Sequence, residues 1–100
     1  MGRQKKHAIL LRSGSLARCA EGLRCAVGLT LAGDQVRVFF TSDATRLASS
    51  AALAIVRPVQ TLSRLGHDLY IDAAHSPHEE IEPTQELQAL LQECDTSAVW

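Results

Sequence analysis

The sequence lacks the features that mark membrane, secreted and nucleic-acid-binding proteins. No stretch approaches the ~20 apolar residues of a membrane span, and the run Ala8–Leu11 is far too short for a signal peptide. The formal net charge of −1 gives no electrostatic reason to expect a nucleic acid or an anionic membrane as partner. We therefore expect a cytoplasmic protein that binds neither.

Cysteine and aromatic residues are also scarce. The three cysteines form no CxxC pair, and their odd number argues against both a disulfide framework and a zinc ribbon. With only four aromatic residues, the core must be built from Leu, Ala, Val and Ile. A chain of 100 residues has room for one core. We therefore expect a single domain at 7–100 behind a basic, flexible tail at 1–6.

Compact apolar and β-branched runs predict strands at about 7–12, 35–41, 68–72 and 96–100. A long helix after the first strand is indicated by apolar residues at helical spacing, namely Leu16, Ala20, Leu23, Val27 and Leu31. Further helices are predicted at about 44–53, from Pro58 to Leu65, and from Pro83 onward. This alternation predicts a single three-layer α/β domain with a mainly parallel sheet of four to five strands, flanked by helices, with flavodoxin-like winding.

Parallel sheets of this kind bind ligands beyond the carboxyl ends of their strands. In this chain we expect that edge to comprise residues 12–19, 41–46 and 72–78. A pocket there is predicted to be lined by Ser13, Gly14, Ser15, Ser42, Asp43, Asp72, His75 and His78.

Two segments carry a resemblance to a known family. The first runs from Leu23-Arg-Cys-Ala-Val-Gly-Leu through Val36-Arg-Val-Phe-Phe-Thr-Ser-Asp-Ala44, and the second from Gly66-His-Asp-Leu-Tyr-Ile-Asp72 to Ile81. With the order of elements from about His7 to Trp100, they make the chain similar to the DsrE/DsrF-like family. That family includes the TusB, TusC and TusD subunits of the sulfur relay and the YchN-like proteins. The resemblance implies a DsrE-like fold, a homo-oligomer of two to six chains, and other sulfur-relay proteins as partners.

The chain departs from this family at the position that carries the chemistry. Sulfur-transferring members have a cysteine at the end of the third strand, which accepts sulfur as a persulfide, and here that position is Asp72. Some YchN-like members have a second cysteine three residues later, where this chain has His75. A carboxylate cannot form a persulfide. The resemblance therefore favours a non-catalytic or regulatory assembly subunit, with Asp72 in a shallow pocket, bonded by backbone N–H groups or by His75 or Arg46.

Cys19 offers the alternative hypothesis, an active sulfurtransferase with a relocated thiol. It lies about one turn into the first predicted helix, where a helix N-terminus can lower a thiol pKa. The same position also suits a small hydrophobic residue that packs beside Leu16. Cys94 continues the apolar stripe of the last helix and is expected in the core, and His7 is expected to be structural.

Two further features each leave two readings open. Asp72, His75, His78 and nearby glutamates are possible metal ligands, but Pro77 interrupts the spacing, no metal-binding signature is present, and a solvated acidic loop explains them without a metal. We expect no metal and no cofactor. The strip Gly22, Cys25, Leu29 and Ala32 lies on the back of the first helix. It fits either chance in an Ala-rich helix or a contact between subunits, and we expect a homo-oligomer.

Overall fold

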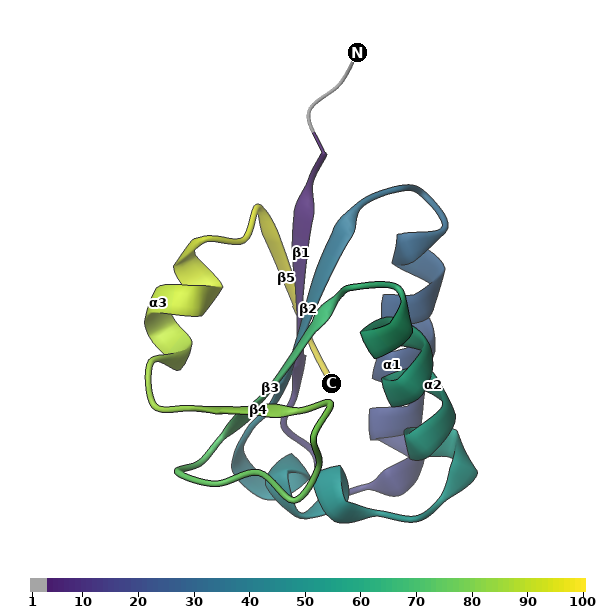
Figure 1. The fold of residues 1–100 in the computed structure, drawn as a ribbon, viewed down its shortest axis with the longest axis vertical. Coiled ribbons are helices and arrows are strands. Elements are labelled where there is room, and N and C mark those ends of the chain that lie inside the picture. The colour runs from purple at the N-terminus through teal and green to yellow at the C-terminus, as the bar shows by residue number, and fades with distance from the viewer. Residues whose placement is uncertain (1–3) are drawn as a thin grey trace.

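Five strands form one all-parallel sheet in the order β4-β3-β2-β1-β5, in a computed structural model that describes residues 4–100 (Figure 1). The paired registers are parallel throughout. This order differs from the 2-1-3-4-5 order of flavodoxin but shares its single reversal of winding. The strands are β1 (Lys6–Leu11), β2 (Gln35–Phe40), β3 (Asp68–Asp72), β4 (Glu82–Thr84) and β5 (Thr96–Val99).

Helices cover both sides of the sheet, which confirms the three-layer α/β architecture. Helices α1 (Leu16–Thr30) and α2 (Leu53–Arg64) pack on one side, here called the α1–α2 face, and α3 (Leu87–Gln92) packs on the other, the α3 face (Figure 1). A 3₁₀ helix, η1 (Ser42–Ser49), follows β2 at the carboxyl edge. From β1 to β4 the chain moves across the sheet in one direction, and from β4 it returns in the other direction to reach β5. Because crossovers between parallel strands are right-handed, a connection in the reverse direction passes over the opposite side of the sheet, which here is the α3 face.

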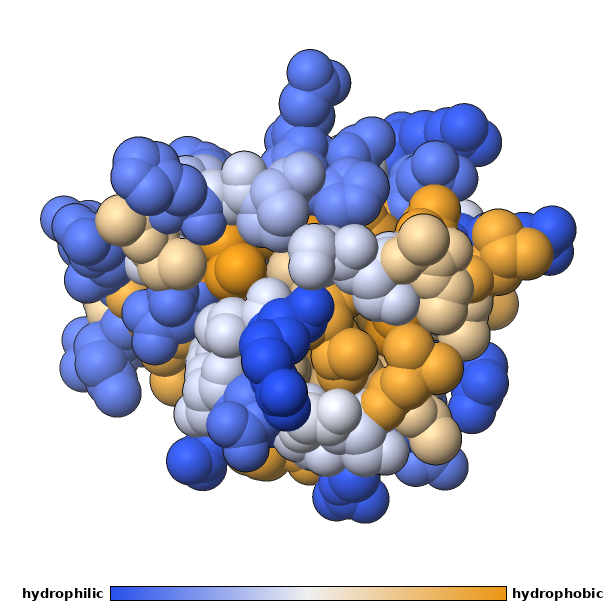
Figure 2. Space-filling view, turned by 90° about the horizontal axis from the view of Figure 1, so that it is seen from below, coloured by the Kyte–Doolittle hydropathy of each residue, from blue (hydrophilic) through white to orange (hydrophobic). Residues whose placement is uncertain are grey.

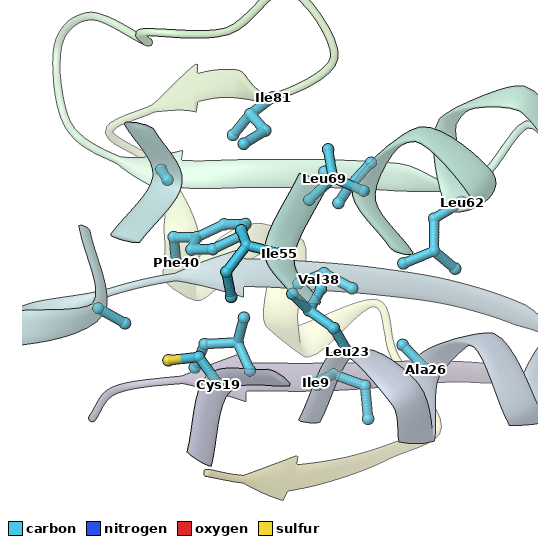
Figure 3. Packing of buried hydrophobic residues seen from close by; sticks show 14 of the residues in the cluster. Ile9, Cys19, Leu23, Ala26, Val38, Phe40, Ile55, Leu62, Leu69 and Ile81 are labelled. Atoms are coloured by element: carbon cyan, nitrogen blue, oxygen red, sulfur yellow. The ribbon is translucent and has the colours of Figure 1, made fainter. Parts of the chain in front are cut away.

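The main hydrophobic core lies on the α1–α2 face. Alternate strand residues such as Ile9, Val38 and Phe40 point into it, and each is at most 1% exposed. They meet residues from α1 and α2, including Leu23 and Ile55 (Figure 3). The two-residue period of the strands and the helical spacing of α1 therefore converge on one apolar layer.

The α3 face has a smaller core. Ala8, Phe39 and Tyr70 are buried there, and the Phe39 and Tyr70 rings stack with centroids 5.3 Å apart. The half-buried residues packed on them are Leu10, Leu87, Leu90, Leu91 and Cys94. Cys94 thus packs in the apolar cluster as expected, where burial raises the pKa of its thiol.

Arg37 fastens α3 to the sheet. Its Nη1 donates to the Leu90 carbonyl at 2.8 Å and to Glu93 Oε1 at 2.7 Å. Arg37 is only 9% exposed, and its buried guanidinium needs such acceptors beneath the helix. A cation at this end of α3 also meets the negative end of the helix dipole.

The start of the domain lies earlier than expected. Lys6 already belongs to β1, and Gln4 Nε2 donates to the Gly33 carbonyl at 2.7 Å. The remainder of the expected tail, residues 1–3, lies outside the described residues. His7 is bonded on both ring nitrogens, with Thr96 Oγ1 at 2.6 Å and Asp34 Oδ2 at 2.8 Å. It thereby ties β1 to β5 and to the turn before β2.

The helix boundaries after β2 were predicted wrongly. The expected helix at 44–53 is the 3₁₀ helix η1, which ends at Ser49, and α2 begins at Leu53. Ser50 Oγ accepts the Ala52 N–H at 3.1 Å and so closes a turn that separates the two. Pro58 consequently lies inside α2 and not in its first turn. Its missing N–H leaves the helical bond to the Ala54 carbonyl unmade, and Ala54 is exposed to water.

The segment from Pro83 was also predicted wrongly. Pro83 is the central residue of the short edge strand β4, and α3 begins only at Leu87. A proline suits an edge strand because its missing N–H can face outward.

The strip on the back of α1 is in part an internal contact. Gly22 is buried, and a Cβ added there would lie 2.5 Å from Leu11 Cδ2 and 2.8 Å from the Trp100 ring. Cys25 and Leu29 are half-buried and pack against the main core, whereas Ala32 is exposed. Gly22 is therefore required by the approach of Trp100, and the strip gives little support to a subunit contact.

Candidate functional site

The loop between β1 and α1 forms one part of the carboxyl edge. Ser13 Oγ accepts the Ser15 N–H at 3.0 Å, and Ser15 caps α1 by accepting the Arg18 N–H at 3.4 Å. The Ser13 N–H in turn donates to the Trp100 carbonyl at 3.1 Å. These bonds fix the loop and use the serine oxygens locally.

Gly14 brings this loop against η1. A Cβ at Gly14 would lie 2.9 Å from Arg46 Nη2 and 3.4 Å from Asp43 Cβ. Ser42, the first residue of η1, has a φ of +50°, in the left-handed region that non-glycine residues rarely adopt. The structure thus brings together five of the predicted pocket residues, namely Ser13, Gly14, Ser15, Ser42 and Asp43.

Cys19 lies directly below this loop, but in the core. It is fully buried, and its Sγ donates to the Ser13 carbonyl at 3.2 Å. Figure 3 shows it in the layer between α1 and the sheet, near Ile55. Burial raises the pKa of the Cys19 thiol, because a thiolate there would lose its hydration. Desolvation therefore outweighs any stabilisation of the thiolate by the α1 N-terminus.

Asp72 lies on the opposite side of the sheet from that loop. It shares strand parity with Tyr70, which packs under α3, so both side chains belong to the α3 face. Asp72 is exposed, and within residues 4–100 its carboxylate has no hydrogen bond or ion pair. The expected enclosure by the 14–16 turn, His75 or Arg46 does not occur, because the alternation of β3 directs Asp72 away from α1.

The two loop histidines lie in different surroundings. His75 is exposed and, within the described residues, without a bonding partner. His78 is half-buried, with Nδ1 3.3 Å from Glu80 Oε2, and lines a small cavity with residues of α2 such as Val56 and Gln60. Across residues 4–100, no three His, Cys, Asp or Glu side chains are grouped so as to hold a metal ion.

The sequence reasoning missed an apolar surface at this edge. Leu16 and Leu53, the first residues of α1 and α2, are 40% and 60% exposed. Figure 2 looks onto the carboxyl edge and shows hydrophobic residues gathered on the side of α1 and α2. Because both helices begin at the carboxyl edge, leucines at their first positions could have been placed there from the sequence.

Comparison with models of known families, with characterised proteins and with solved structures gave no match. No helix within residues 4–100 is both long and apolar enough to cross a membrane.

Proposed function

We propose that the protein is a non-catalytic subunit of a DsrE/DsrF-like assembly, associated with sulfur relay, which contributes a contact surface and does not carry a persulfide. The observation that carries the proposal concerns the two positions at the carboxyl edge where a sulfur-carrying thiol could lie. Asp72 occupies the position of the sulfur-carrying cysteine, and the nearest alternative, Cys19, is fully buried. Neither group offers an accessible thiolate.

The surface of the same edge supports a role in association. The exposed leucines at the starts of α1 and α2 lie on the α1–α2 side of this edge, whereas Asp72 lies on its α3 side. A partner that buried the exposed 40% of Leu16 and 60% of Leu53 would add about half of the roughly 1.5–3 kcal/mol that full burial of an exposed leucine contributes. The edge thus presents apolar surface in place of reactive sulfur.

The alternative function, sulfur transfer through Cys19, requires a specific reaction. The Cys19 thiolate would attack the outer sulfur of a persulfide donor, the donor's S–S bond would break, and the donor would leave as a thiolate. This reaction needs exposure of Sγ and loss of its proton, and both are opposed by burial.

Mass spectrometry after incubation with glutathione persulfide tests the proposal. We expect the native wild-type protein to gain no sulfur on Cys19 and the Asp72→Cys variant to gain one sulfur on the new thiol. Asp72→Asn serves as the control for loss of the carboxylate, and it should fold normally because the Asp72 carboxylate makes no hydrogen bond or ion pair among residues 4–100. Sulfur on wild-type Cys19, abolished by Cys19→Ser, would replace the proposal with the transferase reading.

A further inference from the structure

A groove lies on the α3 face where β3 and β4 pass beneath the start of α3. Its volume is about 400 Å³, within the roughly 300–1,000 Å³ typical of small-ligand sites. The strand register pairs Tyr70 with Glu82, so these two side chains stand next to each other on the same face. The walls are formed chiefly by Tyr70, Glu82, Pro83, Thr84, Glu86 and Leu90.

Tyr70 contributes an unused polar group to this groove. The residue is only 9% exposed, yet its hydroxyl has no hydrogen-bond partner within residues 4–100. This hydroxyl is not among the fully enclosed unpaired side-chain atoms of the described residues, so it opens into the groove, where a ligand can reach it. Burial, followed by the carboxylate of Asp68, raises the pKa of Tyr70, so its hydroxyl remains protonated and can donate or accept.

The charge of the groove is negative. Arg37 is the cation near Tyr70, but its guanidinium is already bound to Glu93 at 2.7 Å and lies 3.9 Å from Asp68. Glu82 and Glu86 are exposed, and neither carboxylate has a hydrogen bond or ion pair among the described residues. A ligand in the groove therefore meets two carboxylates without a cationic partner.

We propose that this groove binds an aliphatic primary ammonium group, either of a free polyamine or of a lysine side chain. The three N–H donors of an ammonium match the Tyr70 hydroxyl oxygen and the carboxylates of Glu82 and Glu86. The methylene stem would lie against Leu90 and Pro83, which line the same groove. This binding does not depend on association through the carboxyl edge.

The edge of β4 argues for this mode of binding over the addition of a peptide strand. Strand addition needs a row of free backbone N–H and C=O groups along the edge strand. β4 has three residues, and its central residue, Pro83, has no N–H. The edge is therefore poorly suited to backbone pairing, and the side chains beside it provide the recognition.

Calorimetric titration of the full chain at low salt tests the proposal with two probes, spermidine and Nα-acetyl-lysine methylamide. We expect binding that weakens with added salt. Glu82→Gln should weaken it about tenfold, and Tyr70→Phe several-fold without lowering thermal stability, as for hydrogen bonds to a charged group. The matched control is Glu21→Gln, an exposed carboxylate on α1 at the other side of the molecule, which should change nothing.

The two probes distinguish the source of the ammonium. Much tighter binding of spermidine supports a free polyamine, and equal binding of both probes supports a lysine side chain. The proposal is overturned if neither probe binds at about 10 mM, a very weak affinity. It is also overturned if magnesium displaces spermidine while Tyr70→Phe and Glu82→Gln bind like the wild type, since the groove would then be only a diffuse acidic surface.

Discussion

The two faces of the sheet are covered to very different extents. The α1–α2 face meets two helices of 15 and 12 residues, and these bury Leu23, Ala26, Ile55 and Leu62 against the strands. The α3 face meets one helix of six residues, none of which is fully buried. Most of the apolar burial that stabilises the fold therefore lies on one side of the sheet.

The same division continues at the carboxyl edge. On the α1–α2 side, the edge presents Leu16 and Leu53, which extend the apolar layer to the surface. On the α3 side, it presents Asp72 and the acidic groove beside Glu82. The thickly covered face thus ends in exposed apolar side chains, and the thinly covered face in acidic ones.

The largest expected effect tests the difference in packing directly. Leu23→Ala should lower the free energy of unfolding by about 2–5 kcal/mol, because it empties a fully buried site between α1 and the sheet. Leu90→Ala, in a half-buried site under α3, should cost about 1 kcal/mol. Urea denaturation of both variants measures the two losses. Equal losses would mean that the α3 face contributes as much as the α1–α2 face.

A second pair of variants tests the contact between α1 and Trp100. Gly22→Ala should destabilise the protein by about 1–3 kcal/mol, because the new methyl group collides with Leu11 and Trp100. Gly28→Ala, in the same helix with nothing within 4 Å of its added Cβ, should stabilise it by about 0.5–1 kcal/mol. Thermal melting followed by the fluorescence of the single tryptophan measures both. Destabilisation by both substitutions would contradict the assigned contact.

The smallest expected effect concerns the attachment of α3. The hydrogen bond from Arg37 holds the pKa of the Glu93 carboxyl below its usual value of 4.5. A carboxyl whose pKa is lower in the folded state stabilises the fold above its unfolded pKa, and this contribution is lost as the pH falls through the folded value. The wild type should therefore exceed Glu93→Gln in melting temperature at pH 6 but not near pH 3, both being approximate conditions chosen around that pKa. Glu79→Gln, an exposed loop variant, is the control. A constant difference across this range would show that the bond to Arg37 does not stabilise the charged form.

The four longer strands could be predicted from the sequence because each is an apolar or β-branched run bounded by turn residues. In a run such as Val36–Phe40, apolar residues point to both faces of the sheet and are buried on both. Such a nearly continuous apolar run is typical of a strand that is covered on both faces. β4 could not be found in this way, because three residues around Pro83 show no periodicity and pair only through the edge of β3. The boundary of α2 depends on a bond from Ser50 that competes with the helix, and helical periodicity does not reveal it.

The candidate site was predictable only in part. The sequence located the loops of the carboxyl edge, since parallel strands place their ends together. The sequence also indicates that Asp72 lies on the same side of the sheet as Tyr70, because these two residues alternate with Leu69 and Ile71 along the strand. Which helices cover that side, however, becomes known only from the structure. The burial of Cys19 agrees with one of the two readings that the sequence left open, a small hydrophobic residue on the apolar side of α1, and residues distant in the chain, such as Ile55, complete the enclosure.

The division between an apolar contact side and an acidic side is tested most directly by the oligomeric state. Sedimentation velocity at tens of micromolar, roughly where weak interfaces fill, would compare the wild type with the Leu16→Asp/Leu53→Asp double variant. An aspartate suits the first turn of a helix, so this variant should fold. The control is Leu31→Lys, an 86% exposed leucine at the C-terminal end of α1, where a cation suits the helix dipole. The account predicts oligomers for the wild type and the control and a monomer for the double variant. A monomeric wild type, or an unchanged double variant, would contradict it.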